Sequence, residues 1–156
     1  MLNQKILKLN FLSEFKSLEY EKTLVLFSHV AAQVQNRAFF NWTNDLIDSE
    51  LKQSHFLVLA LEGEYISFIA YRDNLDFYEI MALGSHNEHR QKGYAHELLR
   101  VLKEQACEAS KKIILEVHDQ NIAAIKLYES AQFKCIGRRS KYYKDLADAL
   151  IYEWGS

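Results

Sequence analysis

The sequence has no proline and is poor in cysteine and glycine, with two and five of these among its 156 residues. Because proline is missing, element boundaries must be read from glycine, asparagine, aspartate and changes of hydrophobic period. The two cysteines, Cys107 and Cys135, have neither CxxC spacing nor the Cys/His spacing of a zinc site. We therefore expect no metal, and Cys135 is predicted to be a small buried apolar side chain.

A surplus of one charge sign and long apolar runs are also lacking. The 19 basic and 21 acidic side chains leave a net charge of −2, which provides no global field for a polyanion. No apolar run is long enough for a membrane span, and no leader-like segment is visible. We therefore expect no nucleic-acid partner, no membrane partner and a reduced, cytoplasmic protein.

The length and composition fit one folded domain over residues 1–156. The chain is 49% hydrophobic and 26% charged, which is the usual balance of a globular protein and excludes fibrous and disordered classes. Aromatic residues make up 13% of the chain, more than packing needs. Some tyrosines are therefore expected in a cleft or at an interface.

Hydrophobic periodicity predicts alternating strands and helices. Residues 11–35 have apolar side chains at helical spacing, with Leu24, Phe27, Ala31 and Val34 on one face. In chain order, the predicted elements are a strand at 4–9, a helix at 11–35, a helix capped by Thr43, strands at 56–61, 65–71 and 77–83, a helix at 94–110, a strand at 113–117, a helix at 121–130, and strands near 133–143 and 148–154.

The three strands between residues 56 and 83 predict an antiparallel meander. The helix at 94–110 has an apolar stripe toward the sheet, with Arg100, Lys103 and Glu104 on its other side. Since this helix is a crossover, the strand at 113–117 should run parallel to the strand before the helix. The predicted class is α/β (α+β), a mixed, mostly antiparallel sheet of six or seven strands with helices on both faces.

The stretch from Arg90 to Ala95 opens the 94–110 helix directly after a strand. A turn centred on Gly93 lets backbone N–H groups point together, and the helix dipole adds positive charge, so a phosphate or pyrophosphate is favoured there. Arg90 and Lys92 contribute charged side chains. Taken alone, the same stretch also fits a solvated helix start without a ligand.

An ordered set of motifs resembles the GNAT acetyltransferases, and within them the RimI-type enzymes that acetylate protein N-termini. Two departures are an alanine, Ala95, where many relatives have a second glycine, and the missing proline before the loop, where residues 84–89 stand instead. The motifs are Trp42-Thr43, Arg90-x-x-Gly93-x-Ala95, Leu115-Glu116-Val117, Asn121, Ala124, Leu127-Tyr128, Phe133, Arg138-Arg139-x-x-Tyr142-Tyr143 and Asp148-Ala149.

The resemblance implies a GNAT fold with a central splayed parallel strand pair, and acetyl-CoA as co-substrate without a metal. His86 and His89 flank the loop, but their spacing meets no further metal ligands. Strands that splay leave unpaired backbone donors, so one N–H of residues 81–83 should face the acetyl carbonyl. The sequence does not decide which of the three residues donates it. The implied cofactor-binding residues are Met81, Ala82, Leu83, Arg90, Gln91, Lys92, Gly93, Tyr94, Ala95, Asn121 and Tyr128.

Glu116 and Tyr128 match the family's catalytic positions. Glu116 lies in an otherwise apolar strand, where desolvation raises a carboxyl pKa and suits it to take a proton from an ammonium. Tyr128 would protonate the departing sulfur. The alternatives are a Glu116 ion pair with a lysine or arginine of a neighbouring strand, a Tyr128 that is only a core aromatic, and an Asn121 that is only a helix N-cap.

Trp42, Tyr142 and Tyr143, together with Glu116, are expected to wall the acceptor groove, although aromatic clusters of this kind also serve packing in edge strands. The leading interpretation is transfer of an acetyl group to a protein N-terminus, as in relatives that modify the N-terminal alanine of a small-subunit ribosomal protein. Transfer to a small amine or a lysine side chain is one alternative. A CoA-binding module without turnover is another.

Overall fold

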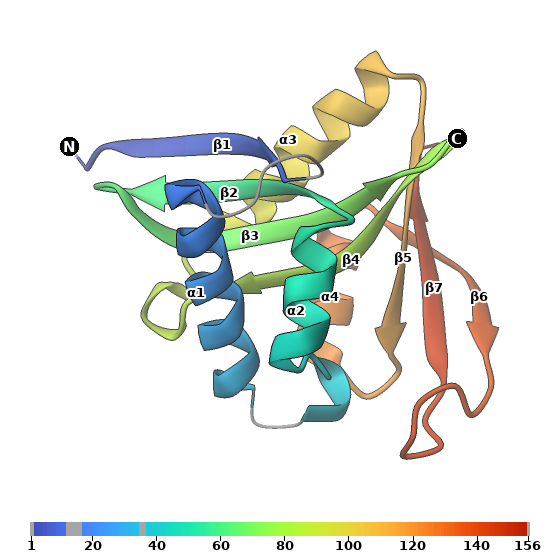
Figure 1. Ribbon diagram of the computed structural model, residues 1–156. Helices are drawn as coiled ribbons and strands as arrows, with labels where there is room; N and C mark the ends of the chain where they lie inside the picture. The colour runs from blue at the N-terminus through green and yellow to red at the C-terminus, as the bar shows by residue number, and fades with distance from the viewer. Residues whose placement is uncertain (1, 12–16, 35–36, 156) are drawn as a thin grey trace.

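The computed structural model describes residues 2–11, 17–34 and 37–155 (Figure 1). Its elements are β1 (Gln4–Asn10), α1 (Leu18–Gln33), the 3-10 helix η1 (Arg37–Phe39), α2 (Asn44–Leu51), β2 (His55–Leu61), β3 (Glu64–Asp73), β4 (Phe77–Ser85), the 3-10 helix η2 (Asn87–His89), α3 (Tyr94–Glu108), β5 (Lys112–His118), α4 (Ile122–Ser130), β6 (Lys134–Arg139) and β7 (Ala149–Trp154).

Seven strands form one sheet in the order β1-β2-β3-β4-β5-β7-β6. Strands β1 to β4 pair antiparallel in sequence order, and β7 pairs antiparallel with both β5 and β6. Among the described strands, β4 and β5 are the one parallel pair, joined by the crossover helix α3. The α/β class, the meander and the parallel crossover predicted from the sequence are therefore confirmed.

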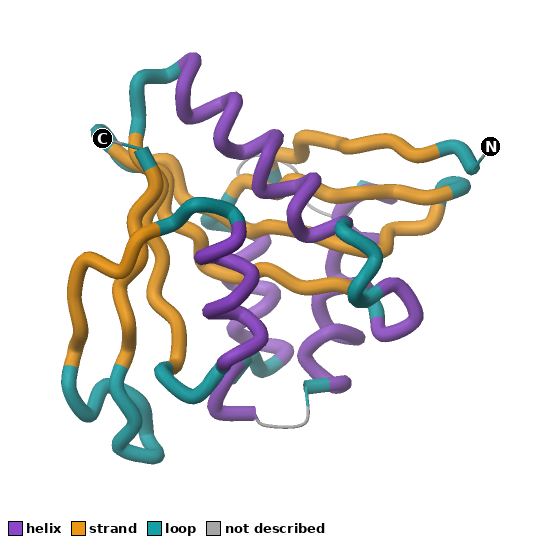
Figure 2. Tube along the Cα trace, turned by 180° about the vertical axis from the view of Figure 1, so that it is seen from behind, coloured by secondary structure: helices purple, strands orange, loops and turns teal. Residues whose placement is uncertain are grey.

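Helices cover both faces of this sheet. Figure 1 shows α1 and α2 in front of the strands, and the view from behind in Figure 2 shows α3 and α4 on the opposite face. The buried apolar side chains accordingly form two clusters, one of which centres on Phe27, Phe56 and Phe68 under α1 and α2. The other includes Leu98 and Leu102 of α3. The sheet thus separates two cores.

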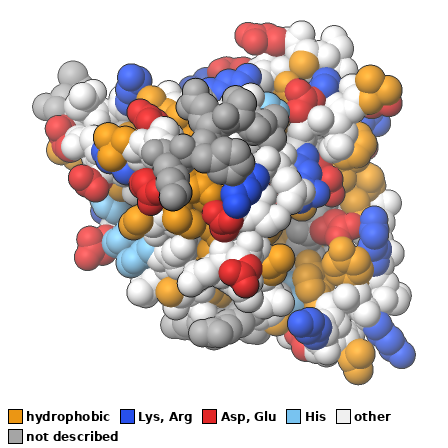
Figure 3. Space-filling model, in the orientation of Figure 1, with side chains coloured by type: hydrophobic (Ala, Val, Ile, Leu, Met, Phe, Trp, Pro, Cys, Tyr) orange, Lys and Arg blue, Asp and Glu red, His pale blue; other side chains and the backbone are white. Residues whose placement is uncertain are grey.

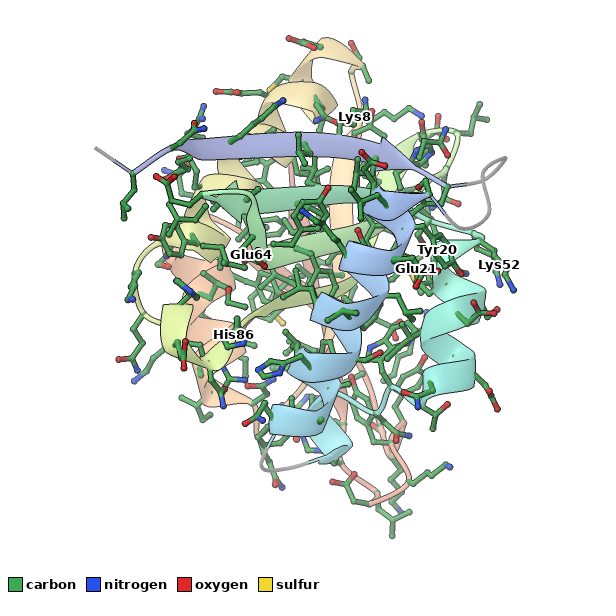
Figure 4. The ribbon with its side chains drawn as sticks, turned by 60° about the vertical axis from the view of Figure 1, so that its left-hand side comes forward. Lys8, Tyr20, Glu21, Lys52, Glu64 and His86 are labelled. Atoms are coloured by element: carbon green, nitrogen blue, oxygen red, sulfur yellow. The ribbon has the colours of Figure 1, made fainter. Side chains whose placement is uncertain are left out.

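Helices α1 and α2 each begin with an N-cap residue. The Ser17 hydroxyl accepts from the Tyr20 N–H at 3.1 Å, and the Thr43 hydroxyl accepts from the Leu46 N–H at 3.3 Å, which confirms the cap predicted for α2. Figure 4 shows Tyr20 and Lys52 where α1 and α2 lie side by side. The Asp48 carboxylate joins them, accepting from the Tyr20 hydroxyl at 2.6 Å and from the Lys52 ammonium at 2.5 Å.

The buried stripe of α1 differs from the predicted one. It includes Tyr20, Thr23, Phe27 and Val30 at helical spacing, whereas Leu24 and Ala31 are only partly buried. The prediction counted apolar residues alone, but Thr23 is fully buried because its hydroxyl donates to a backbone carbonyl one turn back. Of the predicted helix at 11–35, residues 12–16 and 35–36 lie outside the described part of the chain.

Three further expectations are corrected. Lys103 does not face away from the sheet, because its ammonium lies over the rings of Phe133 and Trp154 at 5.4 and 5.2 Å. Cys135 is exposed rather than buried, since it lies on the edge strand β6. The strand predicted near 133–143 ends at Arg139, so the tyrosines after it stand in a loop.

The described helices include none that is both long enough and apolar enough to span a membrane. On the face seen in Figure 3, acidic and basic side chains are interspersed rather than gathered by sign. This distribution agrees with the near balance of the 19 basic and 21 acidic residues.

Gly84 provides a test of how closely α1 packs on the sheet. A Cβ at this position of β4 would lie 2.5 Å from Val30 Cγ1 of α1, so we expect Gly84→Ala to lower the free energy of unfolding by about 1–3 kcal/mol. Denaturant unfolding measures this change. The control is Gly137→Ala in β6, where the new Cβ would meet Ile151 Cδ1 at an ordinary 3.5 Å. Equal stability of Gly84→Ala and the wild type would contradict the close contact.

Candidate active site

Strands β4 and β5 pair over only part of their length. Four residue pairs join them, from Phe77 with Lys112 to Ile80 with Leu115. Beyond these pairs the two strands diverge, and Figure 1 shows β5, β6 and β7 turning away from the first four strands. A gap therefore opens in the middle of the sheet, bordered by the second half of each strand.

Met81 stands at the point where this gap begins. In the pairing of β4 with β3, Ala70 is opposite Ala82 and Tyr71 is opposite Ile80, so Met81 is the extra residue of a β-bulge. On its other side, the pairing with β5 has already ended. Met81 thus has no register partner on either strand, as is typical of the extra residue of a bulge.

A pocket of about 360 Å³ occupies this gap. Its walls come from η1 and the loop after it, from β4, β5 and α4, and from the loop that joins β6 to β7. The described lining residues are Ala38, Phe39, Phe40, Asn41, Trp42, Glu79, Ile80, Met81, Ala82, Leu83, Leu115, Glu116, Val117, His118, Asn121, Ala124, Tyr128, Tyr142 and Tyr143.

The pocket brings together most of the site residues named from the sequence. Those that line it are Trp42, Met81, Ala82, Leu83, Glu116, Asn121, Tyr128, Tyr142 and Tyr143. The loop from Arg90 to Ala95 lies outside its described lining, at the start of α3. Sequence reasoning missed Phe39, Glu79 and His118, because nothing in their local pattern distinguishes them from ordinary packing or surface residues.

The two candidate catalytic side chains reach the pocket from opposite faces of the sheet. Along β5, Leu115 and Val117 belong to the core under α3 and α4, as does Tyr128. Successive strand residues point to opposite faces, so Glu116 and His118 lie on the side of α1 and α2. The gap therefore connects a Tyr128 face and a Glu116 face.

Tyr128 combines a buried ring with a free hydroxyl. Only 7% of the residue is exposed, and its ring meets that of Phe133 edge to face at 5.7 Å. The described residues offer its hydroxyl no hydrogen bond, and burial raises the pKa of this phenol. Tyr128 is thus both a core aromatic and a neutral phenol in the pocket wall.

Asn121 is an N-cap residue that also borders the pocket. Its side-chain oxygen accepts from the Ala124 N–H at 3.3 Å, which makes it the N-cap of α4. The same residue lines the pocket beside Ala124. The cap fixes the start of α4, and this in turn positions Tyr128 two turns further along.

Glu116 has the cationic partner that the sequence left open as an alternative. Arg139 Nε lies 2.9 Å from Glu116 Oε1, and the Glu116 side chain is 24% exposed. Arg139 comes from β6, which is separated from β5 by β7, so the pair spans two strand spacings. Tyr142 completes the group, because its hydrogen bond to Glu116 raises the Tyr142 pKa and its ring lies 5.5 Å from the Arg139 guanidinium.

His118, at the end of β5, forms a hydrogen bond to the loop that joins β6 to β7. Its Nε2 lies 2.8 Å from Asp145 Oδ2, and its Nδ1 accepts from the Gln120 N–H at 3.2 Å, so the ring proton is on Nε2. The buried ring lies between Phe39 and Tyr143, with centroids 4.9 and 4.7 Å away. Because Asp145 is 27 residues away in the chain, no sequence motif indicates this link.

Tyr142 and Tyr143 stand in the β6–β7 loop rather than in the predicted edge strand. Their rings contact each other edge to face at 5.2 Å. Burial and the neighbouring Glu116 raise the pKa of Tyr143 to about 12, so this phenol is neutral at ordinary pH. Trp42, which also lines the pocket, packs on Phe27 with the ring centroids 5.1 Å apart.

The loop before α3 has the geometry of an anion cradle. Gln91 and Gly93 take left-handed backbone angles, with φ of 58° and 84°. No described residue accepts from the N–H groups of Gln91 to Ala95. These donors stand at the positive end of α3, on the same face of the sheet as Tyr128 (Figure 2). The loop is therefore fitted to a phosphate on the Tyr128 side of the gap.

Solved structures of similar fold come from several acetyltransferases. The ribosomal-protein-S18-alanine N-acetyltransferase of Escherichia coli is 22% identical, with a TM-score of 0.76 over 97% of this chain and 92% of that one. Ard1 of Thermoplasma volcanium is 18% identical, with a TM-score of 0.76 over 97% and 96%. At these identities the likeness shows the fold alone.

A third structure, the putative streptothricin acetyltransferase of Bacillus anthracis in complex with acetyl coenzyme A, is 24% identical. Its TM-score is 0.61, over 67% of this chain and 63% of that one. No curated protein matches the sequence significantly. The model of the acetyltransferase (GNAT) family matches residues 14–133, which is most of the sequence. The chain therefore belongs to the GNAT family, the acetyltransferases that use acetyl-CoA as acyl donor.

Proposed function

We propose that the chain transfers an acetyl group from acetyl-CoA to the N-terminal amine of a protein or peptide. The observation that supports this most is the single pocket through the sheet, with Glu116 on one face and Tyr128 on the other. A donor and an acceptor that enter from opposite faces meet at Met81 without competing for space. The same arrangement argues against a CoA-binding module without turnover, since the proton acceptor and the proton donor line one cavity.

The donor side fits acetyl-CoA on the chemistry of the residues present. The N–H groups of Gln91 to Ala95 would hold the pyrophosphate, and the Arg90 and Lys92 side chains would lie at its rim. Asn121 would bind the pantetheine arm with the amide group that its capping role leaves free. The Met81 N–H, outside both ladders, is the donor best placed to hydrogen-bond the acetyl oxygen.

In the proposed transfer, the amine nitrogen forms a bond to the acetyl carbon and the carbon–sulfur bond breaks. Glu116 takes the proton that the amine loses, directly or through a water molecule. Tyr128 gives its proton to the departing sulfur. Because burial raises the pKa of Tyr128, the phenol holds this proton over the whole ordinary pH range. The amine thus loses its proton on the Glu116 face of the sheet, and the sulfur gains a proton on the Tyr128 face.

An N-terminal acceptor is favoured by the fold neighbours and by the aromatic walls. Both the Escherichia coli enzyme and Ard1 resemble this chain over nearly its whole length, and the former is named for an alanine of ribosomal protein S18. Trp42, Tyr142 and Tyr143 would flank the first residues of such a peptide. An N-terminal alanine of a small-subunit ribosomal protein is accordingly the first acceptor to test.

An acceptor panel tests this function. We expect thiol release from acetyl-CoA with a peptide that begins with alanine, and mass spectrometry should place the acetyl group on its α-amine. The controls are the same peptide with a blocked N-terminus and an internal lysine, and a set of small amines. Acetylation confined to lysine side chains or small amines would contradict the proposal.

Gly93→Ala tests the anion cradle. Gly93 has a φ of 84° and nothing within 4 Å of the added Cβ. An alanine there would bear a left-handed strain of about 1–2 kcal/mol, and its Cβ would keep the phosphate from approaching the backbone closely. We therefore expect CoA binding to weaken about tenfold or more. Gly63→Ala is a matched control, with the same φ and the same open space at the β2–β3 turn. Calorimetric titration with CoA measures both variants, and equal affinities would remove the cradle from the donor site.

Tyr128→Phe tests the proton donor. The general acid contributes about 10²–10⁴-fold to turnover, so we expect a loss of that size in thiol release with unchanged CoA affinity. Since the Tyr128 pKa is raised, wild-type turnover should show no loss from phenol ionisation below about pH 10. Tyr78→Phe, a buried tyrosine of β4 outside the pocket lining, serves as control. Unchanged turnover in Tyr128→Phe would leave Tyr128 a packing residue.

A further inference from the structure

We propose that the acceptor carries a second positive charge close to the reacting amine, and that Glu79 binds this charge. The inference rests on the proposed function and specifies its acceptor, an N-terminus with lysine or arginine among its first residues. Glu79 lines the pocket from β4 and has no part in the transfer described above. It is therefore a specificity residue, distinct from the proton acceptor Glu116.

The strand register places Glu79 on the acceptor face. Glu79 is opposite Ile114 of β5, and residues opposite each other in a ladder point to the same face. Glu116 follows Ile114 by two residues and so shares that face. Strands about 4.8 Å apart with about 6.6 Å between alternate residues give about 8 Å between the two glutamate Cα atoms as a lower bound, because β4 and β5 diverge beyond Leu115. The pocket therefore presents two carboxylates to an acceptor on one wall.

The basic side chain opposite Glu79 in the sheet forms its ion pair with a different carboxylate. Arg72 of β3 lies directly opposite Glu79 in the antiparallel ladder, where opposite charges commonly pair. Its guanidinium instead forms a bidentate pair with Glu50 of α2, Nε to Oε1 at 3.2 Å and Nη2 to Oε2 at 2.8 Å. Glu50 is only 4% exposed, so this pair must be kept to avoid an uncompensated buried charge.

The other carboxylates beside Glu79 also have basic partners. Glu116 pairs with Arg139 at 2.9 Å, and Glu153 of β7 pairs with Lys112 at 3.3 Å. Among the side chains that the structure describes, which do not include that of Arg37, none forms a hydrogen bond or an ion pair with the Glu79 carboxylate. A partly buried carboxylate without a counter-charge is a binding group for a cation.

The surroundings of Glu79 favour a cation as well. The charge of Glu79 contributes to raising the Tyr142 pKa, which places the two side chains within electrostatic reach. The described lining contains aromatic rings on this side, including Phe39 and Trp42, and no lysine or arginine. Aromatic faces attract ammonium and guanidinium groups. The wall thus combines negative charge with rings. The guanidinium groups that border it, those of Arg139 and Arg72, are each paired with another carboxylate.

Paired peptides test the inference. They share an N-terminal alanine and differ at the second residue, lysine in one and glutamine in the other. We expect the wild type to prefer the lysine peptide about 10- to 30-fold in kcat/KM, through KM, and Glu79→Gln to lose this preference. Glu64→Gln, which removes the same charge at the start of β3 outside the pocket, should keep it (Figure 4). Unchanged CoA affinity verifies that Glu79→Gln is folded.

Three results would overturn the inference. The first is equal acetylation of both peptides by the wild type, and the second is a preference that survives in Glu79→Gln. The third is a fall in kcat for both peptides with a shifted pH profile, which would make Glu79 the group that takes the proton.

Failure of the proposed function gives a different result, namely that neither peptide is acetylated while small amines are. The charge test then uses butane-1,4-diamine against butylamine. A diamine preference that Glu79→Gln abolishes would still support a cation site at Glu79. The lack of such a preference in the wild type would overturn it.

Discussion

The early end of pairing between β4 and β5 is the constraint on which the site depends. Four residue pairs hold the two strands together, and the β-bulge at Met81 coincides with the point where they separate. A continuous sheet would place a hydrogen-bonded wall between its two faces. The gap replaces part of that wall with a pocket that residues of β4 and β5 line on either side. Every candidate role in the reaction is defined by its position relative to this opening.

The two cores give this opening its asymmetry. On the α3 and α4 side, a helix N-terminus, a loop with left-handed residues and a buried phenol suit an anionic thioester donor. On the α1 and α2 side, two carboxylates and a group of aromatic rings suit a cationic acceptor. In the proposed reaction, charge complementarity thus favours one substrate on each face, and neither substrate has to pass the other.

Much of the fold could be predicted because it depends on local periodicity and on one topological rule. The meander, the crossover helix and the Thr43 cap follow from hydrophobic spacing and capping chemistry. The stripe of α1 and the setting of Lys103 could not be predicted, because both depend on tertiary partners. The bulge at Met81, the pair of Glu116 with Arg139 and the link from His118 to Asp145 likewise depend on distant residues.

The hydrogen bonding of His118 has a consequence for the route of the amine proton. Its Nε2 already carries a proton toward Asp145, and its Nδ1 lone pair is occupied by the Gln120 N–H. To accept a proton, the imidazole would have to break a backbone hydrogen bond within a packed aromatic sandwich. In this hydrogen-bonding pattern the ring offers no free lone pair to the amine of the proposed reaction, even though it borders the pocket. The Glu116 carboxylate and solvent remain as proton acceptors on that face.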